Sequence, residues 1–215
     1  MSDSKNIFIL GDSYSTFKGY IPDGYLSWYS GRKSEATDVV SVTQTWWWQL
    51  IDSTDSHLVR NDSWSGTTIC NTCRPTLDIS TSFINRFEKL VNDGFFEQNE
   101  IDAFLIFGGT NDCWIDAPKG ELIFNNWKEA NLFNILPAVS YLYYRVKKVI
   151  PKAKIITIIN TELNETVTDG MKKAADYFGI KYIQLRNISK QEGHPDVKGM
   201  SQIKEQVAEY LKCDS

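Results

Sequence analysis

The chain has 215 residues, a formal net charge of −4 and 42% hydrophobic residues. This length suits one well-buried α/β domain spanning residues 1–215 and is short for two. The basic residues are scattered, which excludes the concentrated positive surface of a nucleic-acid binder, and no apolar run approaches the roughly 20 residues of a membrane-spanning helix.

The N-terminus shows no apolar signal segment, which favours a cytoplasmic location, although a chain trimmed of its leader would begin in the same way.

Strand and helix patterns alternate along the chain. Five runs have the composition of buried parallel strands: Asn6–Leu10, His57–Arg60, Ala103–Phe107, Lys154–Ile159 and Lys181–Gln184. Helical patterns lie between and after them: Thr45–Ile51, Phe83–Val91, Ala130–Ile150, Val167–Phe178 and Val197–Leu211.

This alternation predicts an α/β fold with a parallel sheet and helices on both faces. We expect a three-layer α/β/α sandwich of the flavodoxin type, with five strands in the order 2-1-3-4-5. Two loops, residues 16–42 and 113–127, exceed the usual length. Long insertions at the carboxyl edge of such a sheet commonly shape a pocket.

The segment Gly11-Asp12-Ser13 follows the first predicted strand without a linker. Open α/β sheets collect their active-site groups at this edge, so Ser13 is a candidate nucleophile. A serine hydroxyl needs a base within hydrogen-bond reach to act in this way. The alternative is that Ser13 only caps a turn or helix.

The candidate base is one of only two histidines in the chain. His57 opens the second predicted strand, where a structural role is expected. His194 lies in a Gly-His-Pro segment just before the last helix, and a neutral imidazole there can accept the serine proton at pH 7. The alternative for His194 is a surface position at a helix entry.

Two further positions could stabilise the negative charge that acyl transfer creates on the carbonyl oxygen. Gly66 would let the main chain approach a substrate closely, and Asn111 would offer its side-chain amide after the third strand. With the main-chain N–H of Ser13, they form a candidate oxyanion hole. Taken singly, Gly66 fits a plain turn and Asn111 an Asx-turn.

In chain order, Ser13, Gly66, Asn111 and His194 resemble the SGNH (GDSL-type) hydrolase family of esterases and lipases. The resemblance runs from Gly11 to about Met200. It implies the flavodoxin-like fold and a serine hydrolase in which Ser13 attacks, His194 carries the proton, and no metal or cofactor is needed.

The chain departs from the family pattern at one position. The family usually places an aspartate three residues before the histidine, and this chain has Gln191 there. The amide oxygen of Gln191 or a backbone carbonyl could orient the imidazole instead, and Glu192 is adjacent. We therefore expect a Ser13–His194 dyad with a neutral orienting partner.

Aromatic residues and cysteines have less specific patterns. The aromatics of the long loops suit a sugar or aryl substrate, but they also suit anchoring of the loops in the core: Trp28, Tyr29, Trp114 and Trp127. Cys70 and Cys73 have the C-x-x-C spacing of a redox pair or half a zinc site. There is no second such pair, so all four cysteines, including Cys113 and Cys213, are expected to be free thiols.

These observations predict a serine esterase that removes short acyl groups, with an acylated carbohydrate as the preferred substrate class. A lipid or thioester acyl hydrolase is the alternative within the class. A catalytically weak binding protein on the same scaffold is the alternative from another class. The oligomeric state stays open.

Overall fold

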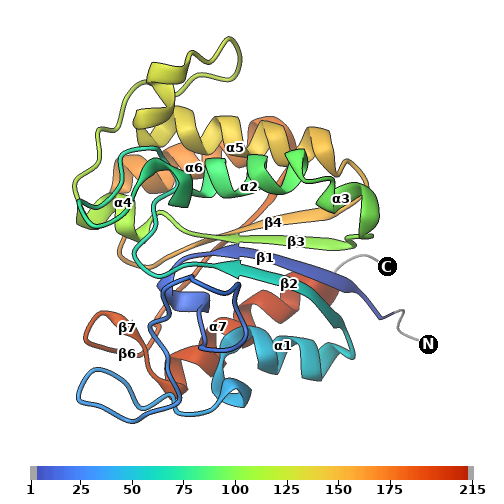
Figure 1. Ribbon diagram of the computed structural model, residues 1–215, viewed down its shortest axis with the longest axis vertical. Coiled ribbons are helices and arrows are strands. Elements are labelled where there is room, and N and C mark those ends of the chain that lie inside the picture. Colours follow the sequence, from blue (N-terminus) through green and yellow to red (C-terminus); the bar gives the residue numbers. More distant parts are fainter. Residues whose placement is uncertain (1–3, 213–215) are drawn as a thin grey trace.

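The computed structural model describes residues 4–212, so the first three residues of the N-terminal segment and Cys213 lie outside the described residues. The sheet has five parallel strands in the order β2-β1-β3-β4-β5, which confirms the predicted order (Figure 1). The strands are β1 (Asn6–Gly11), β2 (His57–Ser63), β3 (Ala103–Phe107), β4 (Lys154–Ile159) and β5 (Lys181–Gln184).

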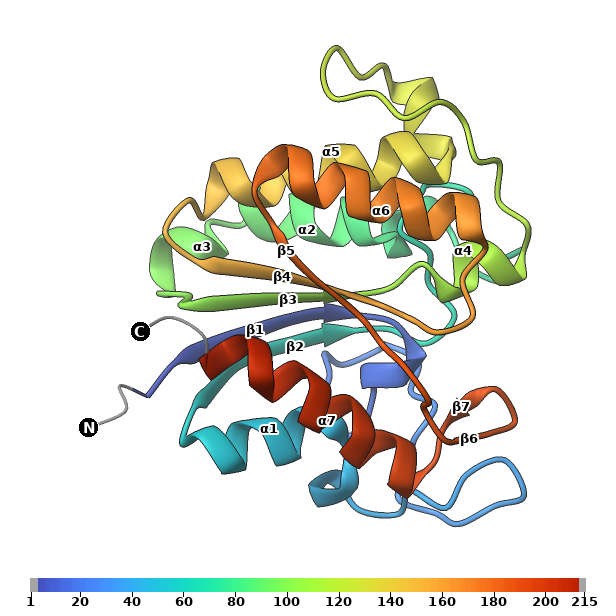
Figure 2. The same ribbon diagram turned by 180° about the vertical axis from the view of Figure 1, so that it is seen from behind.

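Helices cover both faces of this sheet (Figures 1 and 2). One face carries α1 (Trp46–Thr54) and α7 (Val197–Lys212), and the other carries α2 (Phe83–Asn92), α5 (Ile135–Val149) and α6 (Glu165–Phe178). Shorter elements complete the chain: the α-helices α3 (Phe95–Gln98) and α4 (Thr110–Trp114), the 3₁₀ turns η1 (Ser13–Ser15), η2 (Val42–Gln44), η3 (Ile79–Thr81) and η4 (Glu129–Phe133), and a hairpin of β6 (Lys190–Gln191) and β7 (His194–Pro195).

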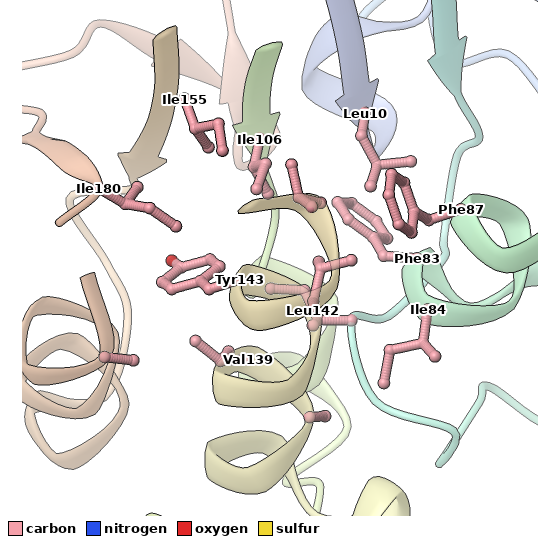
Figure 3. Close-up of a cluster of buried hydrophobic side chains, with 14 of the residues drawn as sticks. Leu10, Phe83, Ile84, Phe87, Ile106, Val139, Leu142, Tyr143, Ile155 and Ile180 are labelled. Carbon is pink, nitrogen blue, oxygen red and sulfur yellow. The ribbon is translucent and has the colours of Figure 1, made fainter. Parts of the chain in front are cut away.

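Two hydrophobic clusters lie on the two faces of the sheet. Phe8 and Leu10 of β1 belong to the cluster under α2 and α5 (Figure 3), whereas Ile7 and Ile9 belong to the cluster with α1 and α7. Successive strand residues point to opposite faces, so a strand buried on both must be apolar throughout. This explains why the strands were recognisable as continuous apolar runs.

The helix predicted over Ala130–Ile150 forms only in part. Residues Glu129–Phe133 make the 3₁₀ turn η4, and Asn134 has extended backbone angles, with φ −111° and ψ 138°. The α-helix therefore begins at Ile135. Pro137 is tolerated because it lies in the first turn, where its missing N–H has no intrahelical acceptor to lose.

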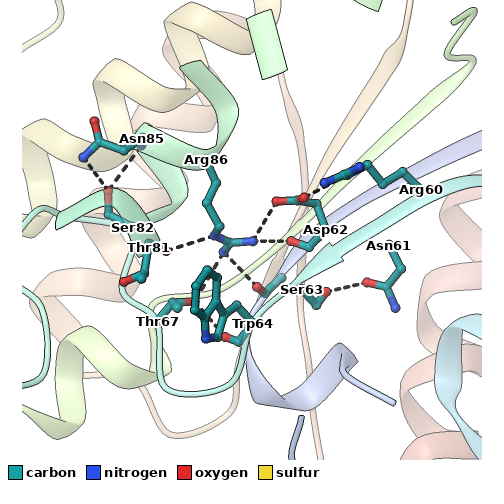
Figure 4. Close-up of polar contacts among 11 residues, drawn as sticks. Arg60, Asn61, Asp62, Ser63, Trp64, Thr67, Thr81, Ser82, Asn85 and Arg86 are labelled. Atoms are coloured by element: carbon teal, nitrogen blue, oxygen red, sulfur yellow. Dashed lines mark hydrogen bonds and ion pairs between the residues drawn. The ribbon is translucent and has the colours of Figure 1, made fainter. Parts of the chain in front are cut away.

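A buried arginine connects the ends of β1 and β2 with the loop that follows β2 (Figure 4). Arg86 of α2 forms an ion pair with Asp62 at 2.9 Å, and both side chains are almost fully excluded from solvent. Its Nη2 donates to the Gly11 carbonyl oxygen at 3.0 Å and to Thr67 Oγ1 at 3.3 Å. These contacts position the two segments from which Ser13 and Gly66 extend.

Within residues 4–212, no helix has the length and apolar character needed to cross a bilayer.

Candidate active site

Four segments meet where the parallel strands end. The turn η1 follows β1, a loop follows β2, α4 follows β3, and the β6–β7 hairpin follows β5. Parallel strands bring their carboxyl ends to one edge, which is where open α/β sheets hold their ligands. Figure 2 shows η1 and the hairpin at this edge.

Ser13 and His194 contact each other across 181 positions of sequence. His194 Nε2 lies 2.9 Å from Ser13 Oγ, within the distance expected for a nucleophile and its base. Both residues are buried, with 2% and 5% of their surfaces exposed. His57 lies at the opposite end of the sheet, at the start of β2, and takes no part in this contact.

The hairpin turn orients the imidazole. Glu192 and Gly193 connect β6 to β7 with φ values of 47° and 74°, a pair of left-handed residues typical of a type I′ turn. The Glu192 carbonyl oxygen lies 3.1 Å from His194 Nδ1. Because a carbonyl can only accept, Nδ1 carries the proton and Nε2 faces Ser13 as the acceptor.

The structure corrects the expectation for Gln191. Its Nε2 donates to the carbonyl oxygen of Glu35 in the 16–42 loop, so this side chain connects two loops and does not orient the imidazole. Glu192 does contact His194, but through its main-chain carbonyl, while the residue itself is exposed.

Three aromatic rings surround the imidazole. Trp28 stacks on it, with centroids 3.6 Å apart and an interplanar angle of 10°. The rings of Tyr14 and Trp114 lie 5.3 and 5.6 Å from its centroid. Tyr14 also donates through its hydroxyl to the Gly193 carbonyl oxygen at 2.5 Å, which ties the nucleophile turn to the hairpin.

Two of the four loop aromatics proposed as pocket residues are anchors instead. Tyr29 is fully buried and donates to the Pro195 carbonyl oxygen at 2.8 Å. Trp127 packs on Tyr141 and Tyr144 of α5, with centroids 5.6 and 5.1 Å away. Trp114 keeps 43% of its surface exposed, so Trp28 and Trp114 are the two that border the site.

The candidate oxyanion donors Gly66 and Asn111 follow β2 and β3, the two strands that flank β1, the strand before Ser13. The main-chain N–H groups of Ser13 and Gly66 have no acceptor among the residues that the structure describes. Gly66 has φ +85°, a left-handed conformation that favours glycine. Asn111 Nδ2 donates to the Thr67 carbonyl oxygen at 3.0 Å, which uses one of its two hydrogens.

Arg74 was not anticipated from the sequence. Its Nε and Nη2 donate to Asn111 Oδ1 at 3.2 and 3.0 Å, so the amide orientation is fixed with Nδ2 on the other side. Its guanidinium also lies over the Trp114 ring, 5.9 Å from the centroid. A loop arginine without periodicity or motif gives no sequence signal for such a role.

Burial sets the protonation states at the site. It lowers the pKa of His194 to about 4; the Lys190 and Arg74 cations add to this effect, and the hydrogen bond from Nδ1 to Glu192 opposes it. His194 is therefore neutral at pH 7 and able to accept a proton. Burial raises the pKa of Asp12 to about 7, against the stabilising hydrogen bond from the Tyr14 N–H.

The part of the chain from residue 4 to 212 contains no group of three or more histidine, cysteine or acidic side chains arranged to hold a metal ion. Cys70, Cys73 and Cys113 are free thiols. Burial raises the pKa of the Cys70 thiol, which keeps it protonated and unreactive.

Comparison with known families decides the assignment. A family model described as GDSL-like lipase/acylhydrolase matches residues 5–211. This chain belongs to the GDSL-like lipase/acylhydrolase family. Family membership makes it a hydrolase of ester bonds.

Solved structures of the same family are similar along their whole length. A protein from Bacteroides uniformis described as a GDSL-like lipase shares 42% identity, with a TM-score of 0.88 over 97% of this chain and 95% of that one. Another from Bacteroides ovatus shares 38%, with a TM-score of 0.90 over 99% and 100%.

An acetyl xylan esterase from Butyrivibrio proteoclasticus is more distant. It has 18% identity and a TM-score of 0.60 over 99% of this chain and 64% of its own, a likeness of fold alone. No curated protein sequence matches the chain significantly.

Proposed function

We propose that this GDSL-family hydrolase is a serine esterase that works through an acyl-enzyme. The 2.9 Å contact between Ser13 Oγ and His194 Nε2 is the observation that carries the proposal. A serine beside a neutral, oriented imidazole is the arrangement that nucleophilic acyl transfer requires.

In this proposal Ser13 Oγ attacks the ester carbonyl carbon while its proton passes to His194 Nε2. The negative oxygen of the tetrahedral intermediate faces the Ser13 and Gly66 N–H groups and the second hydrogen of Asn111 Nδ2. Collapse of the intermediate breaks the ester bond, and the leaving alcohol takes the proton from His194. A water molecule then attacks the acyl-serine in the same way, which releases the acid and restores Ser13.

We further propose a short acyl group on a carbohydrate as the substrate. Side-chain atoms of Leu77 and Arg74 lie 3.4 and 3.6 Å from where a Cβ on Gly66 would be, so these two residues border the candidate oxyanion loop. The exposed Trp114 ring offers an apolar face for the C–H face of a sugar. The acetyl xylan esterase with the same fold agrees with this substrate class.

The test of the proposal uses Ser13→Ala. The variant should lose hydrolysis of p-nitrophenyl acetate by at least about 1,000-fold and should not react with a fluorophosphonate probe, because it lacks the attacking oxygen. Its melting temperature should stay near that of the wild type. Ser53→Ala on α1, remote from the site, is the control. Unchanged hydrolysis by Ser13→Ala would place the nucleophile elsewhere.

Acyl length needs its own measurement. A series of p-nitrophenyl esters from acetate to palmitate should give the highest kcat/KM at the shortest chains. A maximum at long chains would instead support a lipid acyl hydrolase.

A further inference from the structure

His194 must become a cation during the proposed reaction, and its surroundings disfavour a cation. Burial, Lys190 on β6 and Arg74 in the loop after β2 all lower its pKa. No carboxylate forms an ion pair with it among residues 4–212. The Glu192 carbonyl is its hydrogen-bonding partner at Nδ1. Stabilisation of the imidazolium must come in part from neutral groups.

Trp28 is the nearest of the three aromatic rings around the imidazole. The two rings are nearly parallel, at 10°, with centroids 3.6 Å apart. The indole Nε1 is buried and has no acceptor among the described residues. Stacking on His194, and not a hydrogen bond of the indole, therefore determines where this ring lies.

The main chain around Trp28 is bonded to the segments that carry the site. The Trp28 N–H donates to Thr16 Oγ1 at 2.9 Å, and that hydroxyl donates to the Ser13 carbonyl oxygen at 3.0 Å. The Ser65 N–H donates to the Leu26 carbonyl oxygen at 2.9 Å. Tyr29, the next residue, donates through its hydroxyl to the carbonyl oxygen of Pro195 in the hairpin that carries His194. The indole is thus held in a fixed relation to the nucleophile, the oxyanion loop and the base.

We propose that Trp28 is a positioning residue whose π face stabilises protonated His194, in the role that a carboxylate has in a full catalytic triad. This inference rests on the proposed esterase function. Indole attracts cations more strongly than the other aromatic side chains, and the attraction increases when water is excluded. The π face attracts the charged imidazolium more strongly than the neutral imidazole, so it favours the transition state over the ground state.

Graded fluorination of the indole tests this proposal with little change in shape. Trp28 is replaced by mono-, di-, tri- and tetrafluorotryptophan through nonsense suppression in the full chain, and kcat/KM for p-nitrophenyl acetate is measured across pH. Each fluorine withdraws electrons from the ring face. We expect kcat/KM to fall stepwise, by about 3- to 30-fold at the end of the series, the range that cation–π energies correspond to. The acid limb should move to lower pH along the series.

Trp127 provides the matched control, because it packs on α5 and not on His194. The same fluorinated residues at position 127 should leave kcat/KM and the acid limb unchanged. Equal kcat/KM at every degree of fluorination of Trp28 would overturn the proposal. If wild-type hydrolysis and Ser13-dependent probe labelling persist in that case, only the role of Trp28 fails; if they are absent, the proposed function itself fails.

Discussion

Arg74 fixes the orientation of the Asn111 amide and adds positive charge near His194. Arg74→Met removes both donors and the charge. We expect kcat/KM at pH 7 to fall about 10-fold, less than the 100- to 1,000-fold typical of losing an oxyanion donor, because Asn111 itself remains. The pKa of His194 should rise, since a cation that opposes its protonation is gone.

The measurement is the pH profile of kcat/KM, whose acid limb reports the free enzyme's base. With the pKa of His194 at about 4, the wild type should stay active well below pH 6.5 and lose activity as the pH falls through about 4. Arg74→Met should lose activity at a higher pH than the wild type. Arg186→Met, an exposed arginine after β5, should leave the profile in place.

Gln191→Asp introduces the aspartate that the family usually has three residues before the histidine. It tests whether a side chain at position 191 can orient the imidazole in this chain. Since Gln191 bonds to Glu35 and not to the imidazole, a carboxylate at position 191 should move the acid limb only slightly to higher pH, through its charge and not as a hydrogen-bonding partner. The same pH profile checks this. A clear shift of the limb to higher pH would mean that residue 191 reaches His194 after all.

At the level of elements, the β6–β7 hairpin connects local backbone geometry to the chemistry. Gly193 has φ +74°, and a Cβ there would lie 3.4 Å from Trp114. Gly193→Ala should cost about 1 kcal/mol of stability, because an L-residue is strained in this region. It should also lower kcat, because the turn directs the Glu192 carbonyl to the imidazole.

Gly179→Ala is the matched control for this element. Gly179 has φ +64° at the end of α6, and a Cβ there has open space. Both variants should lower the melting temperature by about 2–4 °C, as expected for a chain of this size. Only Gly193→Ala should lower kcat; an equal kcat in the two variants would show that the turn does not control the base.

The sheet and its order were predictable because buried parallel strands are continuous apolar runs, and three of the predicted strands have the observed bounds: Ala103–Phe107, Lys154–Ile159 and Lys181–Gln184. The residues that meet at the strand ends were predictable from motif order. The short elements α3, α4 and the hairpin were missed because turn geometry, and not periodicity, determines them. The orienting carbonyl of Glu192 was among the alternatives, but a main-chain group carries no sequence signature that would select it.

For the whole molecule, Asp12 gives a pH dependence of stability. In the folded protein its carboxyl keeps a proton up to about pH 7, whereas in the unfolded chain it ionises near pH 3.8. Between these values the folded state binds more protons, so rising pH lowers the free energy of unfolding, with a slope that approaches about 1.4 kcal/mol per pH unit. Asp12→Asn should remove this slope.

Thermal unfolding of both proteins from pH 5 to pH 8 measures the difference. His194 contributes the opposite slope between about pH 4 and 6.5, but it is present in both proteins and cancels. The wild type should lose more stability than Asp12→Asn as the pH rises. Asp23→Asn, at an exposed position, controls for the change in charge. Parallel pH curves for the wild type and Asp12→Asn would contradict the expectation.

The position of α7 has a consequence for synthesis on the ribosome. Ile7 and Ile9 of β1 share a hydrophobic cluster with Met200, Ile203 and other residues of α7, so this face of the sheet, which α1 covers only in part, stays partly uncovered until α7 has left the exit tunnel. His194 emerges just before that helix. The nascent chain therefore exposes an apolar surface and lacks its catalytic base over nearly the same period. We expect holdase chaperones to bind this surface until α7 packs on the sheet, by which time His194 is also present.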